Sequence, residues 1–151
     1  ASLPPDLKVM TNKPRGQNDF IITSKMKSNI LFVGFFFVAL LLGLLYYFTG
    51  SDGSISDYNL SMFFTIFVML QFWNLFNAKA FATGRSAFYG LNDSLGFIIV
   101  AILIVVGQIF IVQFGGTVFR TVPLAAMDWL VIIASTSLVL WIGEIGRLIK
   151  K

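Results

Sequence analysis

The chain has 151 residues, of which 57% are hydrophobic and 12% are charged, and its formal net charge is +4. A soluble domain of this length cannot bury so large an apolar fraction, so lipid is the expected surrounding of the chain. Because cysteine and histidine are absent, disulfides, thiolate or imidazole metal sites and histidine-dependent catalysis are excluded. The basic residues lie beside long apolar runs, which predicts a role in membrane orientation and no nucleic-acid partner.

Residues 1–29 are polar and contain three of the four prolines, without the apolar core of a cleavable signal peptide. This segment starts abruptly at Ala1-Ser2-Leu3 and is expected to be a cytoplasmic loop within a longer protein. Residues 30–48 follow as an uncharged apolar run. A bilayer core needs roughly 20 apolar residues in a helix, so this run predicts a first membrane span.

Residues 50–59 have a turn composition and contain two aspartates but no lysine or arginine. The second predicted span, residues 60–80, is interrupted by three amides, Gln71, Asn74 and Asn77. A short basic stretch leads to the third span, residues 94–114, where Gly115-Gly116 is expected to end the helix and turn the chain. The fourth span covers residues 127–148, and residues 149–151 form a short basic end.

The distribution of basic residues predicts the orientation. Five lie before the first span, two between the second and third spans and three at the end of the chain, whereas Arg120 is the only one in the two other connections. Under the positive-inside rule this asymmetry places both termini in the cytoplasm. The predicted fold is therefore an all-α membrane protein of four transmembrane helices.

Three segments of the chain carry a resemblance to a known family. Residues 1–26 contain ASLPP, PRG and IIT before Met26, residues 67–79 read FVMLQFWNLFNAK, and residues 108–116 read QIFIVQFGG, followed by Phe119, Pro123-Leu124 and Trp129. In this order they resemble the end of a P-type calcium-transporting ATPase of the plasma-membrane type, from the loop after transmembrane segment six to segment ten. The family's long regulatory tail is missing after Lys151, so a bacterial pump in the inner cell membrane is expected.

The resemblance implies a function for the longer protein. Such a pump couples ATP hydrolysis, through an aspartyl-phosphate, to calcium export, with ATP, Mg²⁺ and transported Ca²⁺ as its ligands. The phosphorylation machinery lies outside these 151 residues, so the segment alone is expected to be inactive and to hold no cofactor. Its expected partners are the lipid bilayer and the remaining helices and cytoplasmic domains of the pump.

The resemblance also implies roles for single residues. Pro4, Pro5, Pro14 and Arg15 fall in the loop that relays movement of the phosphorylation domain to the membrane helices; a solvated, proline-stiffened connection explains them equally well. Gln71 falls where two-calcium pumps place a glutamate ligand, which implies one calcium per cycle.

The three amides of the second span are the candidate metal ligands. Residues three apart share a helical face, so Gln71, Asn74 and Asn77 are predicted to form one inward-facing stripe of calcium-compatible oxygens. The alternative is that these amides only bond neighbouring helices, a use worth about 0.6 to 2 kcal/mol each in membranes.

The polar residues of the fourth span are predicted to have structural roles. Glu144 is predicted to pair with Arg147 at the membrane interface, three residues later. Ser135, Thr136 and Ser137 are expected to bond the preceding helical turn and to favour close packing.

Two functions remain open at this stage. The first is the C-terminal membrane part of a calcium-exporting ATPase, acting as a helical scaffold and contributing to the ion path. The alternative is a free-standing four-helix transporter subunit or scaffold, in which the amides line a dimer interface or a narrow path.

Overall fold

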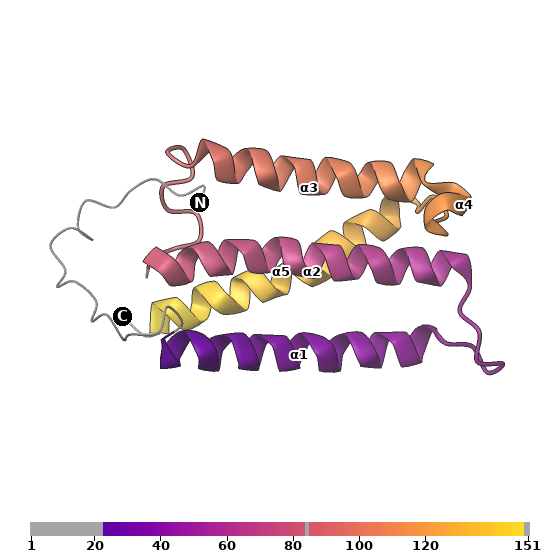
Figure 1. Ribbon diagram of the computed structural model, residues 1–151, viewed down its shortest axis with the longest axis horizontal. Coiled ribbons are helices and arrows are strands. Elements are labelled where there is room, and N and C mark those ends of the chain that lie inside the picture. Colours follow the sequence, from indigo (N-terminus) through magenta and orange to yellow (C-terminus); the bar gives the residue numbers. More distant parts are fainter. Residues whose placement is uncertain (1–22, 84, 150–151) are drawn as a thin grey trace, which may run out of the picture.

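A computed structural model describes residues 23–83 and 85–149. Within these ranges all regular structure is helical, and four helices are long and apolar enough to cross a membrane (Figure 1). They are α1 (Ser24–Phe48), α2 (Asp57–Thr83), α3 (Leu95–Phe114) and α5 (Ala126–Ile149), with the short α4 (Gly116–Phe119) between the last two. The predicted all-α fold with four membrane spans is thus confirmed.

The helices extend beyond the apolar runs because local caps and turns determine their ends. α1 begins at Ser24, before the apolar run, and the Thr23 hydroxyl accepts a bond from the Met26 N–H at 3.3 Å. At its other end, the Thr49 hydroxyl donates to the Leu45 carbonyl oxygen at 2.7 Å. With 25 residues, α1 is about 37 Å long, enough to cross a hydrocarbon core of about 30 Å.

The connections have the turn chemistry that the sequence predicts. Between α1 and α2, Gly53 has a φ of 76°, which glycine adopts without steric cost, and the Asp52 carboxylate accepts bonds from the hydroxyl and N–H of Ser54. α3 ends at Phe114, and Gly116 has a φ of 49° in the following turn. The glycine pair therefore ends the helix and turns the chain, as expected.

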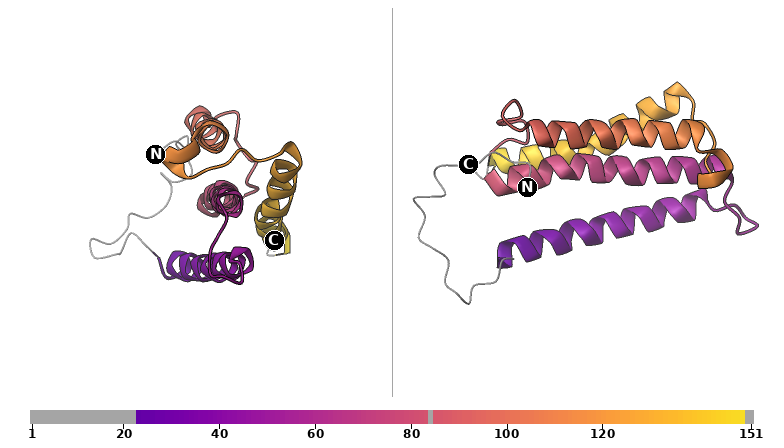
Figure 2. Two further views of the ribbon diagram at one scale, coloured as in Figure 1. Left: turned by 90° about the vertical axis from the view of Figure 1, so that its right-hand side faces the viewer. Right: turned by 45° about the horizontal axis from the view of Figure 1, so that its top comes forward.

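The α2 helix is the centre of the bundle. α1, α3 and α5 each pack against α2, and the contact with α5 is the most extensive. Figure 1 shows α5 crossing α2 obliquely, and the end-on view in Figure 2 shows α2 lying between α1 and α3 with α5 to one side. The start of α1 and the end of α5 lie at the same end of the bundle, as an even number of spans requires.

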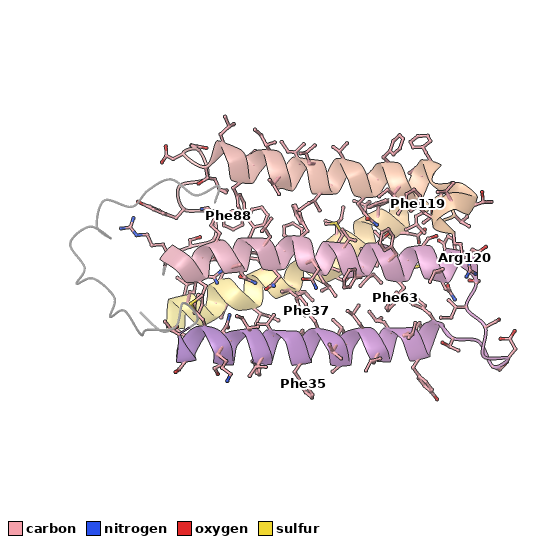
Figure 3. All side chains as sticks on the ribbon, viewed as in Figure 1. Phe35, Phe37, Phe63, Phe88, Phe119 and Arg120 are labelled. Atoms are coloured by element: carbon pink, nitrogen blue, oxygen red, sulfur yellow. The ribbon has the colours of Figure 1, made fainter. Side chains whose placement is uncertain are left out.

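The buried core follows the α2–α5 contact. One cluster consists of Met69, Val112, Leu124 and Ile132, and a second, nearer the end of α5, consists of Ala80, Ala87 and Leu140. Most other large apolar side chains are exposed, as expected for helices in lipid. On α1, Phe35 is 76% exposed and points away from the bundle, whereas Phe37 is 5% exposed and points toward α2 (Figure 3).

Hydroxyl and amide groups connect the helices at several levels. Gln108 on α3 donates to Thr65 on α2 at 3.3 Å, and Trp73 on α2 donates to Thr136 on α5 at 3.1 Å. The hydroxyl of Thr136 also donates to the carbonyl of Ile132. Ser135 and Ser137 likewise bond carbonyls three residues earlier, which confirms the expected back-bonding of all three hydroxyls.

Candidate functional site

The three amides predicted as ligands all lie on α2, but they have different surroundings. Asn77 faces α5: its Nδ2 donates to the Val139 carbonyl at 2.9 Å, and its Oδ1 accepts from the Arg147 guanidinium at 3.0 Å. Asn77 therefore bonds a neighbouring helix, which is the alternative that the sequence left open. Both ends of its amide are occupied.

Gln71 and Asn74 differ from Asn77 in having no hydrogen-bond partner among residues 23–83 and 85–149. The Gln71 side chain is exposed and that of Asn74 is half-buried. A side-chain amide without a hydrogen-bond partner costs free energy within a membrane span unless a polar group or a polar path adjoins it. These two residues are thus the amides whose polar groups the described helices leave available for other ligands or partners.

The three amides do not all face the same neighbours, and helical geometry gives the reason; their role as a stripe of ligands stays a prediction. Each residue advances by about 100° around the axis, so a step of three falls about 60° short of a full turn. Over two such steps Asn77 lies about 120° around α2 from Gln71. This is enough to bring Asn77 against α5 while Gln71 points elsewhere.

Gln71 belongs to a side of α2 that no described helix covers. Phe67, Gln71 and Ala78 recur at helical spacing and are all exposed. Figure 2 shows α1, α3 and α5 around α2, with no helix on the side opposite α5. We refer to the surface formed by Phe67, Gln71, Asn74 and Ala78 as the open face of α2.

The open face can supply only part of a calcium site. Calcium takes six to eight oxygen ligands as a rule, whereas two amides offer two oxygens. In the described ranges no group of three or more acidic, histidine or cysteine residues could hold a metal ion. Any ion bound at this face would need further oxygens from outside the described helices.

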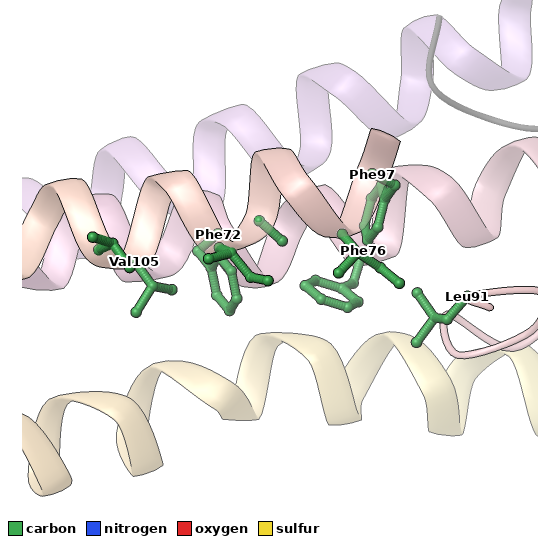
Figure 4. A pocket seen from close by; sticks show the side chains of 9 residues that line it. Phe72, Phe76, Leu91, Phe97 and Val105 are labelled. Carbon is green, nitrogen blue, oxygen red and sulfur yellow. The ribbon is translucent and has the colours of Figure 1, made fainter. Parts of the chain in front are cut away.

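A groove of about 300 Å³ between α2 and α3 is entirely apolar (Figure 4). Its lining includes Phe72 and Phe76 of α2, Phe97 and Val105 of α3, and Leu91 of the connection between these helices. Since no polar side chain reaches into it, this groove lacks the chemistry of an ion site. The available polar groups lie on the open face instead.

A second polar cluster lies where α2 and α5 end. The predicted pair is confirmed, because Arg147 contacts Glu144 at 2.9 Å with the two side chains 22% and 12% exposed. Glu144 also accepts the Ala87 N–H at 2.5 Å and the Ser86 hydroxyl at 3.2 Å. The carboxylate therefore fixes the α2–α3 connection to the last helix.

Neither these wider contacts of Glu144 nor the burial of Lys79 is predicted from the sequence. Lys79 is 5% exposed and donates to the Tyr89 carbonyl, with its ammonium 5.8 Å from the centre of the Phe97 ring. A signal for both was present in the sequence, because Lys79 and Glu144 are charged residues within predicted membrane spans and such groups need a partner there. The partners themselves are distant in sequence or lie in the backbone.

The predicted coupling-loop residues Pro4, Pro5, Pro14 and Arg15 lie outside the described residues. Their relay role therefore stays a prediction.

Comparison with known proteins places the chain in a family. Residues 1–149 match the family model described as cation transporting ATPase, C-terminus. The chain belongs to this family. The match covers all four long helices, and the family model describes the C-terminus of cation transporting ATPases.

Relatives of the chain in this family are plasma membrane calcium-transporting ATPases. The mca-1 protein of Caenorhabditis elegans is 30% identical over 155 residues, covering 93% of this chain. Plasma membrane calcium-transporting ATPase 1 of Homo sapiens is 29% identical over 140 residues, covering 86% of this chain. The chain spans only 12% of the length of each of these relatives.

Proposed function

We propose that this chain is the C-terminal membrane part of an ATP-driven calcium export pump. The family membership and the plasma-membrane calcium pumps among its relatives support this proposal. ATP hydrolysis, the binding of Mg²⁺ and ATP, and most calcium ligands would belong to the rest of the pump. The four helices would act as a scaffold, with both termini in the cytoplasm of a cell membrane.

The open face of α2 is the observation that carries the proposed ion-path role. Gln71 and Asn74 are amides without partners among the described residues, on a side of α2 that α1, α3 and α5 leave uncovered. In lipid such groups would be costly, but they are satisfied if polar membrane helices of the same pump pack there. Gln71 would then supply a neutral ligand or line the ion path, with one calcium transported per cycle. A measured stoichiometry of two calcium ions would contradict this last point.

Calcium uptake into inverted vesicles that contain the intact pump tests this role. Gln71→Ala is expected to raise the half-saturating calcium concentration about fivefold to tenfold, equivalent to about 1 to 1.4 kcal/mol. Gln108→Ala is the matched control, since Gln108 is also an amide within a span but is buried and bonded to Thr65. Equal responses of the two variants, at equal protein levels, would reduce Gln71 to a packing residue.

The alternative function is a free-standing four-helix transporter subunit or scaffold. The same open face would then line a dimer interface or a narrow path. The gene sequence upstream of Ala1 distinguishes the two functions. A reading frame that continues upstream and encodes an Asp-Lys-Thr-Gly motif supports the pump, whereas a start codon directly before Ala1 supports the alternative. A bacterial source stays a prediction, because the relatives named above are animal proteins.

A further inference from the structure

In the contact between α2 and α5, the Asn77 side chain lies directly over Gly143. A Cβ atom on Gly143 would lie 2.7 Å from Cγ and 2.9 Å from Nδ2 of Asn77, and its three nearest neighbours would all be atoms of this amide. By contrast, a Cβ atom on Gly146 would have nothing within 4 Å. Gly143 is therefore a glycine whose missing side chain makes room for the Asn77 amide of the neighbouring helix.

Asn77 cannot move aside without losing hydrogen bonds. Its Nδ2 bonds the Val139 carbonyl and its Oδ1 bonds Arg147, at 2.9 and 3.0 Å. Arg147 is in turn held by Glu144 at 2.9 Å. The amide is thus held at both ends by α5, and it fills the space that a methyl group on Gly143 would need.

This contact determines which way α2 is turned about its own axis. α2 is one continuous helix from Asp57 to Thr83, so fixing Asn77 against α5 also fixes the direction of Gln71, about 120° around the axis. Side-chain ends lie roughly 5 Å from a helix axis, so a rotation of about 10° moves them by about 1 Å. A displacement of this size is enough to disturb a binding geometry.

We infer that Asn77, Gly143 and Arg147 are positioning residues, which hold α2 in the rotation that directs Gln71 to the open face. The inference rests on the proposed function, because it takes the open face as part of the ion path. Asn77 acts on ion binding only through the rotation of α2, and it touches no ion. Because Asn77 faces α5, its inferred positioning role differs from the role of metal ligand that the sequence predicts for it.

Gly143→Ala tests the inference in the intact pump, with Gly146→Ala as the matched control on the same helix. The added methyl group at Gly143 displaces Asn77, so we expect the half-saturating calcium concentration to rise roughly two- to thirtyfold at an unchanged maximal rate. Gly146→Ala should leave both values unchanged. Asn77→Ala should raise the half-saturating concentration without adding bulk, which covers the case in which Gly143→Ala fails to fold.

Two double variants separate positioning from a general loss of structure. Gly143→Ala should add nothing in the Asn77→Ala background, because the atoms it displaces are gone. It should also add nothing in the Gln71→Ala background if it acts through Gln71. A shift that adds to that of Gln71→Ala, or a fall in maximal rate alone, overturns the positioning role and leaves the proposed role of Gln71 standing. If Gln71→Ala itself leaves calcium activation unchanged, the proposed role of Gln71 fails first and the positioning role fails with it.

Discussion

Removal of the Glu144 carboxylate should destabilise the bundle more than the loss of any exposed ion pair. Glu144 is 12% exposed in its side chain and accepts three bonds, from Arg147 at 2.9 Å, Ala87 N–H at 2.5 Å and Ser86 at 3.2 Å. Bonds of this kind contribute about 0.6 to 1.5 kcal/mol each, so Glu144→Ala should lower the free energy of unfolding by about 2–4 kcal/mol. The guanidinium of Arg147 is also left half-satisfied in a low-dielectric region, which favours the upper end of this range.

Thermal unfolding of the purified protein in detergent measures this effect. Arg120→Ala is the matched control, because Arg120 pairs with Asp57 at 3.2 Å but the two side chains are 71% and 56% exposed. An exposed pair contributes at most about 1 kcal/mol, so this variant should unfold close to the unmodified protein. Glu144→Gln, which keeps an acceptor oxygen for the Ala87 N–H, should fall between the two. If Glu144→Ala unfolds no earlier than Arg120→Ala, the carboxylate does not hold the α2–α3 connection and the reasoning is refuted.

Two further predictions concern the connections between spans. The hydroxyl and N–H of Ser54 lower the pKa of Asp52 below its ordinary value of 3.8, so this turn gains stability above about that pH and loses it as the pH falls through the lowered pKa. Ser54→Ala should therefore move the pKa of Asp52 back toward 3.8 in a carboxyl NMR titration, and an unchanged pKa would contradict the role of the hydroxyl. The chain has no cysteine, so Ser54→Cys and Ser86→Cys provide single labels for orientation. A membrane-impermeant maleimide should label Ser54→Cys from outside the cell and Ser86→Cys only after the membrane is opened, and the reverse pattern would overturn the cytoplasmic placement of the termini.

The sequence by itself determined the spans and their kind. Four uncharged or nearly uncharged apolar runs of about 20 residues can be satisfied only as membrane helices, because lipid offers no partner for backbone polar groups. Local chemistry was also predictable where it involves neighbours in sequence. The Glu144–Arg147 pair and the hydroxyl bonds of Ser135, Thr136 and Ser137 all connect residues three or four apart.

Only the tertiary structure decided what each amide of α2 does. Spacing alone placed Gln71, Asn74 and Asn77 on one stripe, but each step of three residues ends about 60° short of a full turn, and the crossing of α5 determines which member it meets. The partners of Asn77, Val139 and Arg147, lie 62 and 70 residues away, and the glycine at position 143 makes room for the Asn77 amide. No periodicity within α2 records those conditions, because the rotation of a helix in a bundle is determined by the surface it packs against.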